Sequence, residues 1–237
     1  TIYDCGVEHG QAYFAMELVE GKPLDEAVGK KACTIREALD VFLQIADAVS
    51  YAHQRGVIHR DLKPRNILID GQRQVHVLDF GLAKAIHDAD APAITVTGVF
   101  TGTFSYASPE QVSTGSSVTD VRSDVYTLGV LLYQMLTDAL PYPVTGGQRA
   151  VTEQILKTVP HCPSRLRAEI PDDLDTIVLR ALSKEPERRY QSAAEMRDDV
   201  QRFMHGKAIV AKQDSRLYVL RKTLQNYRWQ FRTAVAG

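Results

Sequence analysis

The sequence predicts an α+β protein in which a small amount of β-sheet precedes a mostly helical carboxyl-terminal part. Before residue 20 the chain shows a short alternating run beside turn residues, which is typical of strands. From residue 34 onward, apolar residues recur at spacings of three and four in several long segments, which is typical of amphipathic helices. With 237 residues, of which 44% are hydrophobic and 24% charged, the chain is long enough for one large core, but its composition names no function.

The first part of the chain holds one long helix among short strands. A T-x-x-E capping box formed by Thr34 and Glu37 begins the helix, which we expect to run to about Arg55 and to stop at Gly56. The other elements expected there are a hairpin turn and three strands: the turn at 7–10 and the strands at 12–19, 66–69 and 75–78.

The second part begins with a long segment without regular periodicity, residues 82–110, which is rich in Gly, Thr, Ser and Pro and is typical of a functional loop. Residues 124–136 are apolar almost all round, which predicts a buried core helix. Three further helices are expected at 147–158, 172–183 and 193–205, the last opened by a second capping box, Ser192 to Glu195.

The charges divide unevenly along the chain. Residues 207–237 hold seven Lys or Arg against one acid, so this basic tail carries +6 and the rest of the chain −7. The tail also contains aromatic residues and ends in the apolar stretch 233–236, a pattern that favours the cytoplasmic approach to a membrane helix. A solvated helix and a nucleic-acid patch are the alternatives. No apolar run reaches the roughly 18 residues that span a bilayer.

The three cysteines are far apart and form no C-x-x-C pair, so neither a metal site nor a redox couple is indicated: Cys5, Cys33 and Cys162. A reducing cytosol fits this usage.

Three motifs carry the chemistry of the sequence. The run His59-Arg60-Asp61-Leu62-Lys63-Pro64-Arg65-Asn66 follows the long helix, Asp79-Phe80-Gly81 follows the third strand, and Ser108-Pro109-Glu110 closes the long loop. Alone, the first is commonly a helix-end ion cluster and the second a turn. Together and in this order, they resemble the protein kinase superfamily, specifically its bacterial serine/threonine kinases, over about residues 2–206.

The resemblance implies a protein-kinase-like fold and the roles that phosphoryl transfer to a hydroxyl requires. Asp61 would accept the proton of the substrate hydroxyl, and Lys63 would steady the γ-phosphate of ATP. Asn66 and Asp79 would hold Mg²⁺, or Mn²⁺ in its place. The expected ATP-binding residues are the gatekeeper Met16, the hinge residues Glu17 to Val19, Leu68 beneath the adenine, and Asp79.

Other residues would have supporting roles by the same resemblance. Arg60 marks activation by loop phosphorylation, for which Thr95 and Thr97 are the expected sites. The structural contacts expected are His59 against Phe80, Thr103 with Asp61 and Lys63, Asp124 with the backbone of the catalytic loop, Gly129 at a tight helix contact, and a buried ion pair between Glu110 and Arg189.

The Gly-rich loop and the V-A-I-K lysine of the family lie upstream of the hinge and do not fit before Met16. We therefore expect residues 1–19 to be a remnant of the amino lobe, 20–206 the carboxyl lobe and 207–237 a juxtamembrane tail, and we expect this truncated chain to be inactive alone. The stretch 209–212 (IVAK) imitates the lysine motif but lies after the last helix.

The expected partners are protein substrates with Ser or Thr and a second copy for autophosphorylation, with no nucleic acid. A membrane helix beyond residue 237 would place the kinase in the cytoplasm. The alternatives are a pseudokinase scaffold that binds partners without transferring phosphate, and a small-molecule phosphotransferase of the aminoglycoside-kinase type. The long loop argues against the second.

Overall fold

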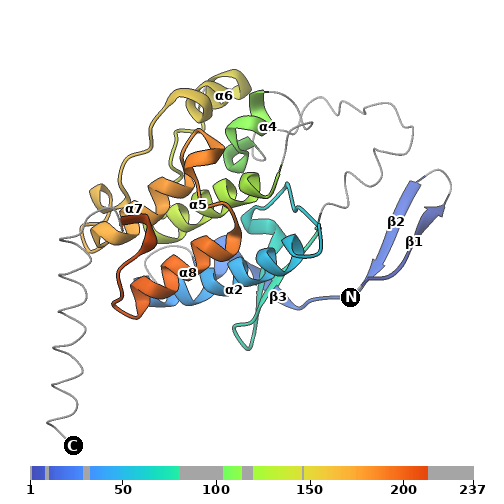
Figure 1. The fold of residues 1–237 in the computed structure, drawn as a ribbon. Coiled ribbons are helices and arrows are strands. Elements are labelled where there is room, and N and C mark those ends of the chain that lie inside the picture. The colour runs from blue at the N-terminus through green and yellow to red at the C-terminus, as the bar shows by residue number, and fades with distance from the viewer. Residues whose placement is uncertain are drawn as a thin grey trace, which may run out of the picture.

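A computed structural model describes residues 2–8, 11–28, 33–80, 104–113, 120–145 and 147–212. Figure 1 shows a helical body with a β-hairpin beside it. The strands and α-helices are β1 (Ile2–Glu8), β2 (Gln11–Met16), β3 (Gly21–Pro23), α1 (Leu24–Ala27), α2 (Ile35–His53), β4 (Ile67–Asp70), β5 (Val75–Val77), α4 (Pro109–Ser113), α5 (Val121–Thr137), α6 (Gly147–Lys157), α7 (Asp172–Ala181) and α8 (Ala193–Met204).

The strands form two antiparallel sheets. β1 pairs with β2, and β3, β4 and β5 form a second sheet in that order. The strand expected at 12–19 is therefore too long, because β2 ends at Met16. Residues 17–20 instead connect the two sheets, since the chain pairs again only at Gly21, whose partner is Asp70. The three-residue strand β3 has no periodicity of its own and was not predicted.

Helix α2 begins as expected. The Glu37 N–H donates to Thr34 Oγ1 at 3.2 Å, and the Thr34 N–H donates to Glu37 Oε2 at 2.9 Å, which completes the capping box. The helix ends at His53, and Gly56 follows at φ +76°, a conformation that glycine adopts without a steric cost. The apolar face of α2 is buried against α5 and α8.

Helix α5 is the centre of the body and packs against α2, α7 and α8 (Figure 1). It is buried on nearly all sides, as its sequence predicts. A Cβ added at Gly129 would lie 2.8 Å from Ala181 Cβ, so only glycine permits this approach of α5 to α7.

Helix α8 has half of its expected capping box. The Glu195 N–H donates to Ser192 Oγ, whereas the Glu195 carboxylate accepts from the Gln191 N–H at 2.8 Å and not from Ser192.

The segment that follows α8 is attached to the body. The buried carboxylate of Asp199 accepts hydrogen bonds from the backbone N–H of Val210 at 2.6 Å and of Ala211 at 2.9 Å. Lys212 Nζ lies 3.0 Å from Asp173 Oδ1 on α7. Lys212, the lysine of the stretch 209–212 that imitates the family's lysine motif, is thus bound to α7.

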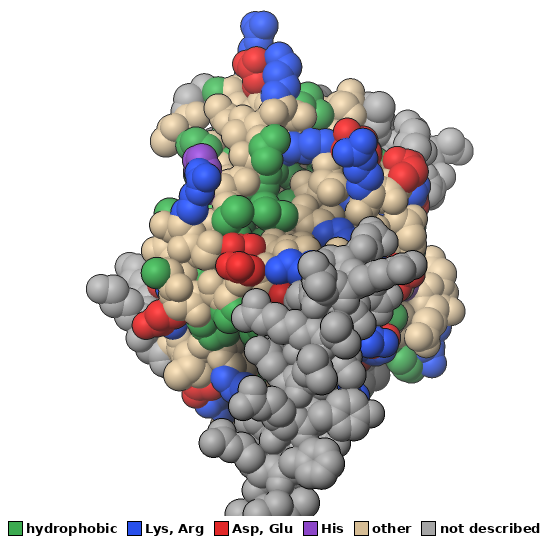
Figure 2. Space-filling view, turned by 60° about the vertical axis from the view of Figure 1, so that its left-hand side comes forward, with side chains coloured by type: hydrophobic (Ala, Val, Ile, Leu, Met, Phe, Trp, Pro, Cys, Tyr) green, Lys and Arg blue, Asp and Glu red, His purple; other side chains and the backbone are tan. Residues whose placement is uncertain are grey.

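The expected juxtamembrane residues after Lys212 lie outside the described residues. Within the described part of the chain, no helix is long and apolar enough to cross a bilayer. On the face that Figure 2 shows, Lys and Arg side chains are interspersed with Asp and Glu around a group of hydrophobic side chains.

Candidate functional site

One buried carboxylate anchors the backbone of the loop between α2 and β4. Asp124, on α5, is 1% exposed, and its oxygens accept the backbone N–H of His59 at 2.8 Å and of Arg60 at 2.9 Å. His53 Nε2 donates to the same carboxylate at 2.7 Å. Arg60 lies in the left-handed region at φ +67°. The contact expected for Asp124 is present, and His53 is a second partner that sequence reasoning did not find.

The front of the same loop presents a carboxylate, an ammonium and an amide in one cluster. Lys63 Nζ lies 2.6 Å from Asp61 Oδ2, and Asn66 Nδ2 donates to the Asp61 carbonyl oxygen at 2.8 Å. The Asp61 side chain is 45% exposed, so a ligand can reach its carboxylate. In this arrangement the Asp61 carboxylate can accept a proton, and the Lys63 ammonium can attract an incoming anion.

Asp79 is held close to this cluster through its neighbours. The Leu78 N–H donates to the Asn66 carbonyl oxygen at 2.8 Å, and His59 Nε2–H donates to the Leu78 carbonyl oxygen at 2.8 Å. The His59 and Phe80 rings pack with their centroids 4.9 Å apart, as expected. Asp79 itself is exposed, at φ +57°.

The amide of Asn66 and the carboxylate of Asp79 offer the oxygen ligands that Mg²⁺ prefers. Among the described residues, no group of three His, Cys, Asp or Glu could hold a metal by itself. A magnesium site built from two protein side chains and phosphate oxygens fits this donor set.

A cavity of about 430 Å³ lies at the expected hinge. It is lined by Glu17, Leu18, Val19, Glu20, Asp70, His76, Val77 and Leu78. Glu17 and Val19, two of the expected hinge residues, therefore both line this cavity. Among the described residues that line this cavity is Leu78 but not Leu68, which was expected to lie beneath the adenine. Met16 is the last residue of β2.

A smaller cavity of about 120 Å³ lies beside Asp61, between the 59–66 loop and the 104–113 segment. Its lining includes Asp61, Tyr106, Gln111 and Thr127. Tyr106 OH donates to Gln134 Oε1 at 2.8 Å, and burial raises the pKa of Tyr106 to about 12. The segment is thus fixed next to the proposed catalytic carboxylate.

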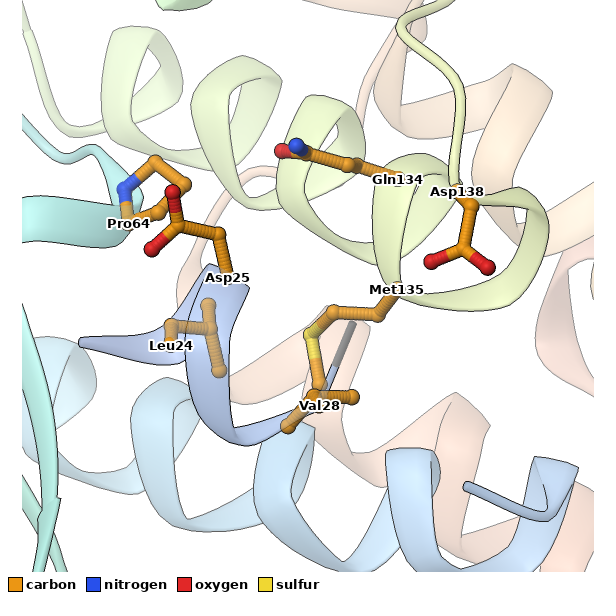
Figure 3. Close-up of a pocket in the computed structure, with 7 residues that line it drawn as sticks. All are labelled: Leu24, Asp25, Val28, Pro64, Gln134, Met135 and Asp138. Carbon is orange, nitrogen blue, oxygen red and sulfur yellow. The ribbon is translucent and has the colours of Figure 1, made fainter. Parts of the chain in front are cut away.

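Figure 3 shows a third cavity, of about 280 Å³, between α1 and α5. Leu24, Val28 and Met135 supply its apolar wall, and Pro64 of the 59–66 loop lies at one side. The cavity therefore lies next to the loop that carries Asp61.

The residues expected to regulate the site are only partly described. Thr95 and Thr97 lie outside the described residues, as does Thr103, which was expected to contact Asp61 and Lys63. Arg60, the expected partner of a phosphate on Thr95 or Thr97, has a buried Nε atom without a hydrogen-bond partner within the described part of the chain.

The expected ion pair between Glu110 and Arg189 is present. Arg189 is 1% exposed, and two of its nitrogens donate to the two Glu110 oxygens at 2.8 Å each. The remaining N–H groups of the Arg189 guanidinium donate hydrogen bonds to the backbone carbonyl oxygens of Arg122, Ser183 and Lys184. Burial alone would raise the pKa of Glu110, but hydrogen bonds from Arg189 and Ser123 outweigh burial and lower this pKa to about 2.

Comparison with known proteins agrees with this geometry. The family described as "Protein kinase domain" matches residues 1–200. The chain is 41% identical over 211 residues to the serine/threonine-protein kinase PknB of Mycobacterium leprae, and 42% identical over 212 residues to PknB of Mycobacterium tuberculosis; each match covers 87% of this chain and 33% of the relative. PknB of Mycolicibacterium smegmatis is 42% identical over 197 residues, or 83% of this chain and 31% of the relative. The chain thus spans about a third of the length of these relatives.

Proposed function

Because this chain belongs to the protein kinase family and resembles its serine/threonine members, we propose that its natural gene product transfers the γ-phosphate of ATP to Ser or Thr hydroxyls of proteins. The observation that supports this most directly is the cluster of Asp61, Lys63 and Asn66 in one turn, with Lys63 Nζ 2.6 Å from Asp61 Oδ2. Asp124 anchors that turn through hydrogen bonds from the backbone N–H groups of His59 and Arg60.

In the proposed reaction, Asp61 orients the substrate hydroxyl and accepts its proton as the oxygen attacks phosphorus. Lys63 places a positive charge beside the same carboxylate, where the transferring phosphoryl group would pass. Asn66 and Asp79 would hold Mg²⁺, which supplies charge neutralisation on the phosphate oxygens. The backbone of residues 17–19, which lines the hinge cavity, would hydrogen-bond the adenine.

The 237 residues by themselves carry neither a G-x-G-x-x-G run nor a V-A-I-K lysine ahead of the hinge. Lys212, the lysine of the imitation motif, pairs with Asp173 instead. We propose that these residues transfer no phosphate when produced alone, and that 20–206 act as the carboxyl lobe.

We also propose that the basic tail approaches a membrane from the cytoplasmic side, since basic residues and aromatics are interleaved there. Fractionation of the natural gene product tests this: recovery in the membrane pellet supports the proposal, and recovery in the soluble fraction contradicts it.

The test of the main proposal is phosphate transfer from labelled ATP by the natural gene product, with Asp61→Asn and Asp79→Ala as variants. Each is expected to lower turnover by about 10² or more. Asp47→Asn, an exposed aspartate paired with Arg197, is the control and is expected to leave turnover unchanged.

Near-normal turnover of Asp79→Ala with magnesium would overturn the assignment. A wild-type protein that binds partners but transfers no phosphate would identify a scaffold. Phosphate on an aminoglycoside but on no protein would identify a small-molecule phosphotransferase.

A further inference from the structure

The peptide between Arg60 and Asp61 lies at a strained point of the chain. Arg60 has φ +67°, which residues with a Cβ rarely adopt unless surrounding contacts impose it. The carbonyl group of this peptide belongs to Arg60 and its N–H to Asp61. The orientation of this peptide plane therefore helps to set the position of the backbone from which the Asp61 side chain extends.

Two side chains from outside this turn hold its backbone. Asp124 accepts the N–H of His59 and of Arg60. Gln111 Nε2 donates to the Arg60 carbonyl oxygen at 2.8 Å. Asp124 fixes the peptides that enter the turn, and Gln111 is bonded to the peptide that leads directly to Asp61.

The same Gln111 side chain also binds the 104–113 segment. Its Oε1 accepts the Ser108 N–H at 2.8 Å, so both ends of one amide are used. This amide bridges the catalytic turn and the segment across the cavity of about 120 Å³ that Asp61 and Gln111 both line.

We propose that Gln111 is a positioning residue, whose amide holds the Arg60 carbonyl and so keeps Asp61 aimed at the hydroxyl bound against the 104–113 segment. This inference rests on the proposed function, because it assigns Asp61 the role of proton acceptor.

The chain contains a matched control for this arrangement. Gln44 Nε2 donates to the Arg73 carbonyl oxygen at 3.3 Å, and Gln44 Oε1 accepts the Val75 N–H at 3.1 Å. Arg73 also lies in the left-handed region, at φ +62°. Gln44 therefore makes the same kind of pair, in which its amide donates to the carbonyl oxygen of a left-handed arginine and accepts a backbone N–H, but both of its partners lie in and beside the β4–β5 turn.

The experiment compares Gln111→Met and Gln44→Met in the natural gene product. Methionine keeps the length of the side chain and removes both hydrogen bonds. A third variant, Gln111→Glu, keeps an acceptor for Ser108 N–H but no donor for the Arg60 carbonyl. The readouts are the single-turnover rate of phosphate transfer, the KM for ATP, and deuterium exchange of the backbone amides in peptides covering 57–66 and 70–77.

Gln111→Met and Gln111→Glu are expected to lower the single-turnover rate about tenfold or more, because a small misplacement of a catalytic group is costly, and to change the KM for ATP less than about twofold. Exchange should rise in 57–66. Gln44→Met is expected to raise exchange in 70–77 and to keep the wild-type rate.

A Gln111→Met rate within twofold of wild type would overturn the inference, as would an equal loss in Gln44→Met. Unchanged exchange in 57–66 would also overturn it. If the wild-type protein transfers no phosphate, the proposed function fails, whereas the exchange measurement still decides whether Gln111 holds the turn.

Discussion

Glu110 and Arg189, which are 79 residues apart in sequence, meet through two parallel hydrogen bonds of 2.8 Å. The carboxylate is on α4 and the guanidinium follows the 3-10 turn after α7, so this pair connects the end of the long loop to the helical body. Its energetics lead to the first two predictions.

Arg189→Ala should lower the free energy of unfolding by about 3 kcal/mol or more, because the substitution leaves the Glu110 carboxylate partly buried without its cation. Urea unfolding measures the change. Arg197→Ala is the control, since Arg197 pairs with the exposed Asp47, and it should cost about 1 kcal/mol or less. Equal losses in the two variants would contradict the prediction.

The stabilisation from Glu110 should disappear in acid. Its pKa is lowered from 4.5 to about 2 in the folded protein, so the unfolded chain binds the proton more tightly. The contribution is therefore complete above pH 4.5 and is lost as the pH falls toward 2. The difference in unfolding free energy between wild type and Glu110→Gln should shrink over this interval. A difference independent of pH would exclude the linkage.

Lys184 should also make the folded state more stable as the pH rises, but in the alkaline range. Burial, with Arg189 nearby, lowers the pKa of Lys184 from 10.5 to about 8. Its ammonium donates to Tyr142 OH at 2.7 Å and to the Ile155 carbonyl oxygen at 2.5 Å. The unfolded chain keeps the proton longer, so the folded state gains stability as the pH rises from about 8 to 10.5.

This gain should be visible as a difference between wild type and Lys184→Met, measured by urea unfolding at pH 7.5, about 9 and about 10. Lys184→Arg is the control, since a guanidinium stays charged throughout this range. If the unfolding free energies of wild type and Lys184→Met changed in parallel with pH, the prediction would be contradicted.

Gly129→Ala should be destabilising by about 1–3 kcal/mol, because the added methyl group meets Ala181 Cβ at 2.8 Å and forces α5 and α7 apart. Gly71→Ala is the control, since a Cβ there meets nothing within 4 Å. Thermal unfolding compares the two variants. A Gly129→Ala protein as stable as Gly71→Ala would show that α7 moves without cost.

Autophosphorylation should occur at Thr95 or Thr97 more than at Thr101 or Ser105. A phosphate adds about −1.5 to −2 charges, and the buried Nε of Arg60 is a donor without a partner among the described residues. Mass spectrometry of the active gene product identifies the sites. The Thr95→Ala, Thr97→Ala double variant should lose activity, whereas Thr101→Ala serves as the control in the same loop. Full activity of the double variant would contradict the switch.

Features that depend on neighbours in sequence could be predicted. The capping box at Thr34, the helix at 124–136 and the cluster of Asp61, Lys63 and Asn66 are each determined within a few residues. The end of β2 was missed because it is set by pairing with β1, in which Met16 lies opposite Ile2. Strand β3 was missed because it depends on pairing with β4, about 50 residues later. Gln111 was missed for the same reason: its partner Arg60 is 51 residues upstream, and no local pattern marks a side-chain bond to a distant carbonyl.

The attachment of residues 210 and 211 to Asp199 has a mechanical consequence. A pull transmitted through Lys212 would load the two backbone hydrogen bonds to Asp199 and the contact between Lys212 and Asp173. Tyr190 OH also donates to Asp199, and Tyr190 adjoins Arg189. Tension on the tail would therefore reach Arg189, which holds Glu110, through the side chains of Asp199 and Tyr190 and the backbone that joins Tyr190 to Arg189.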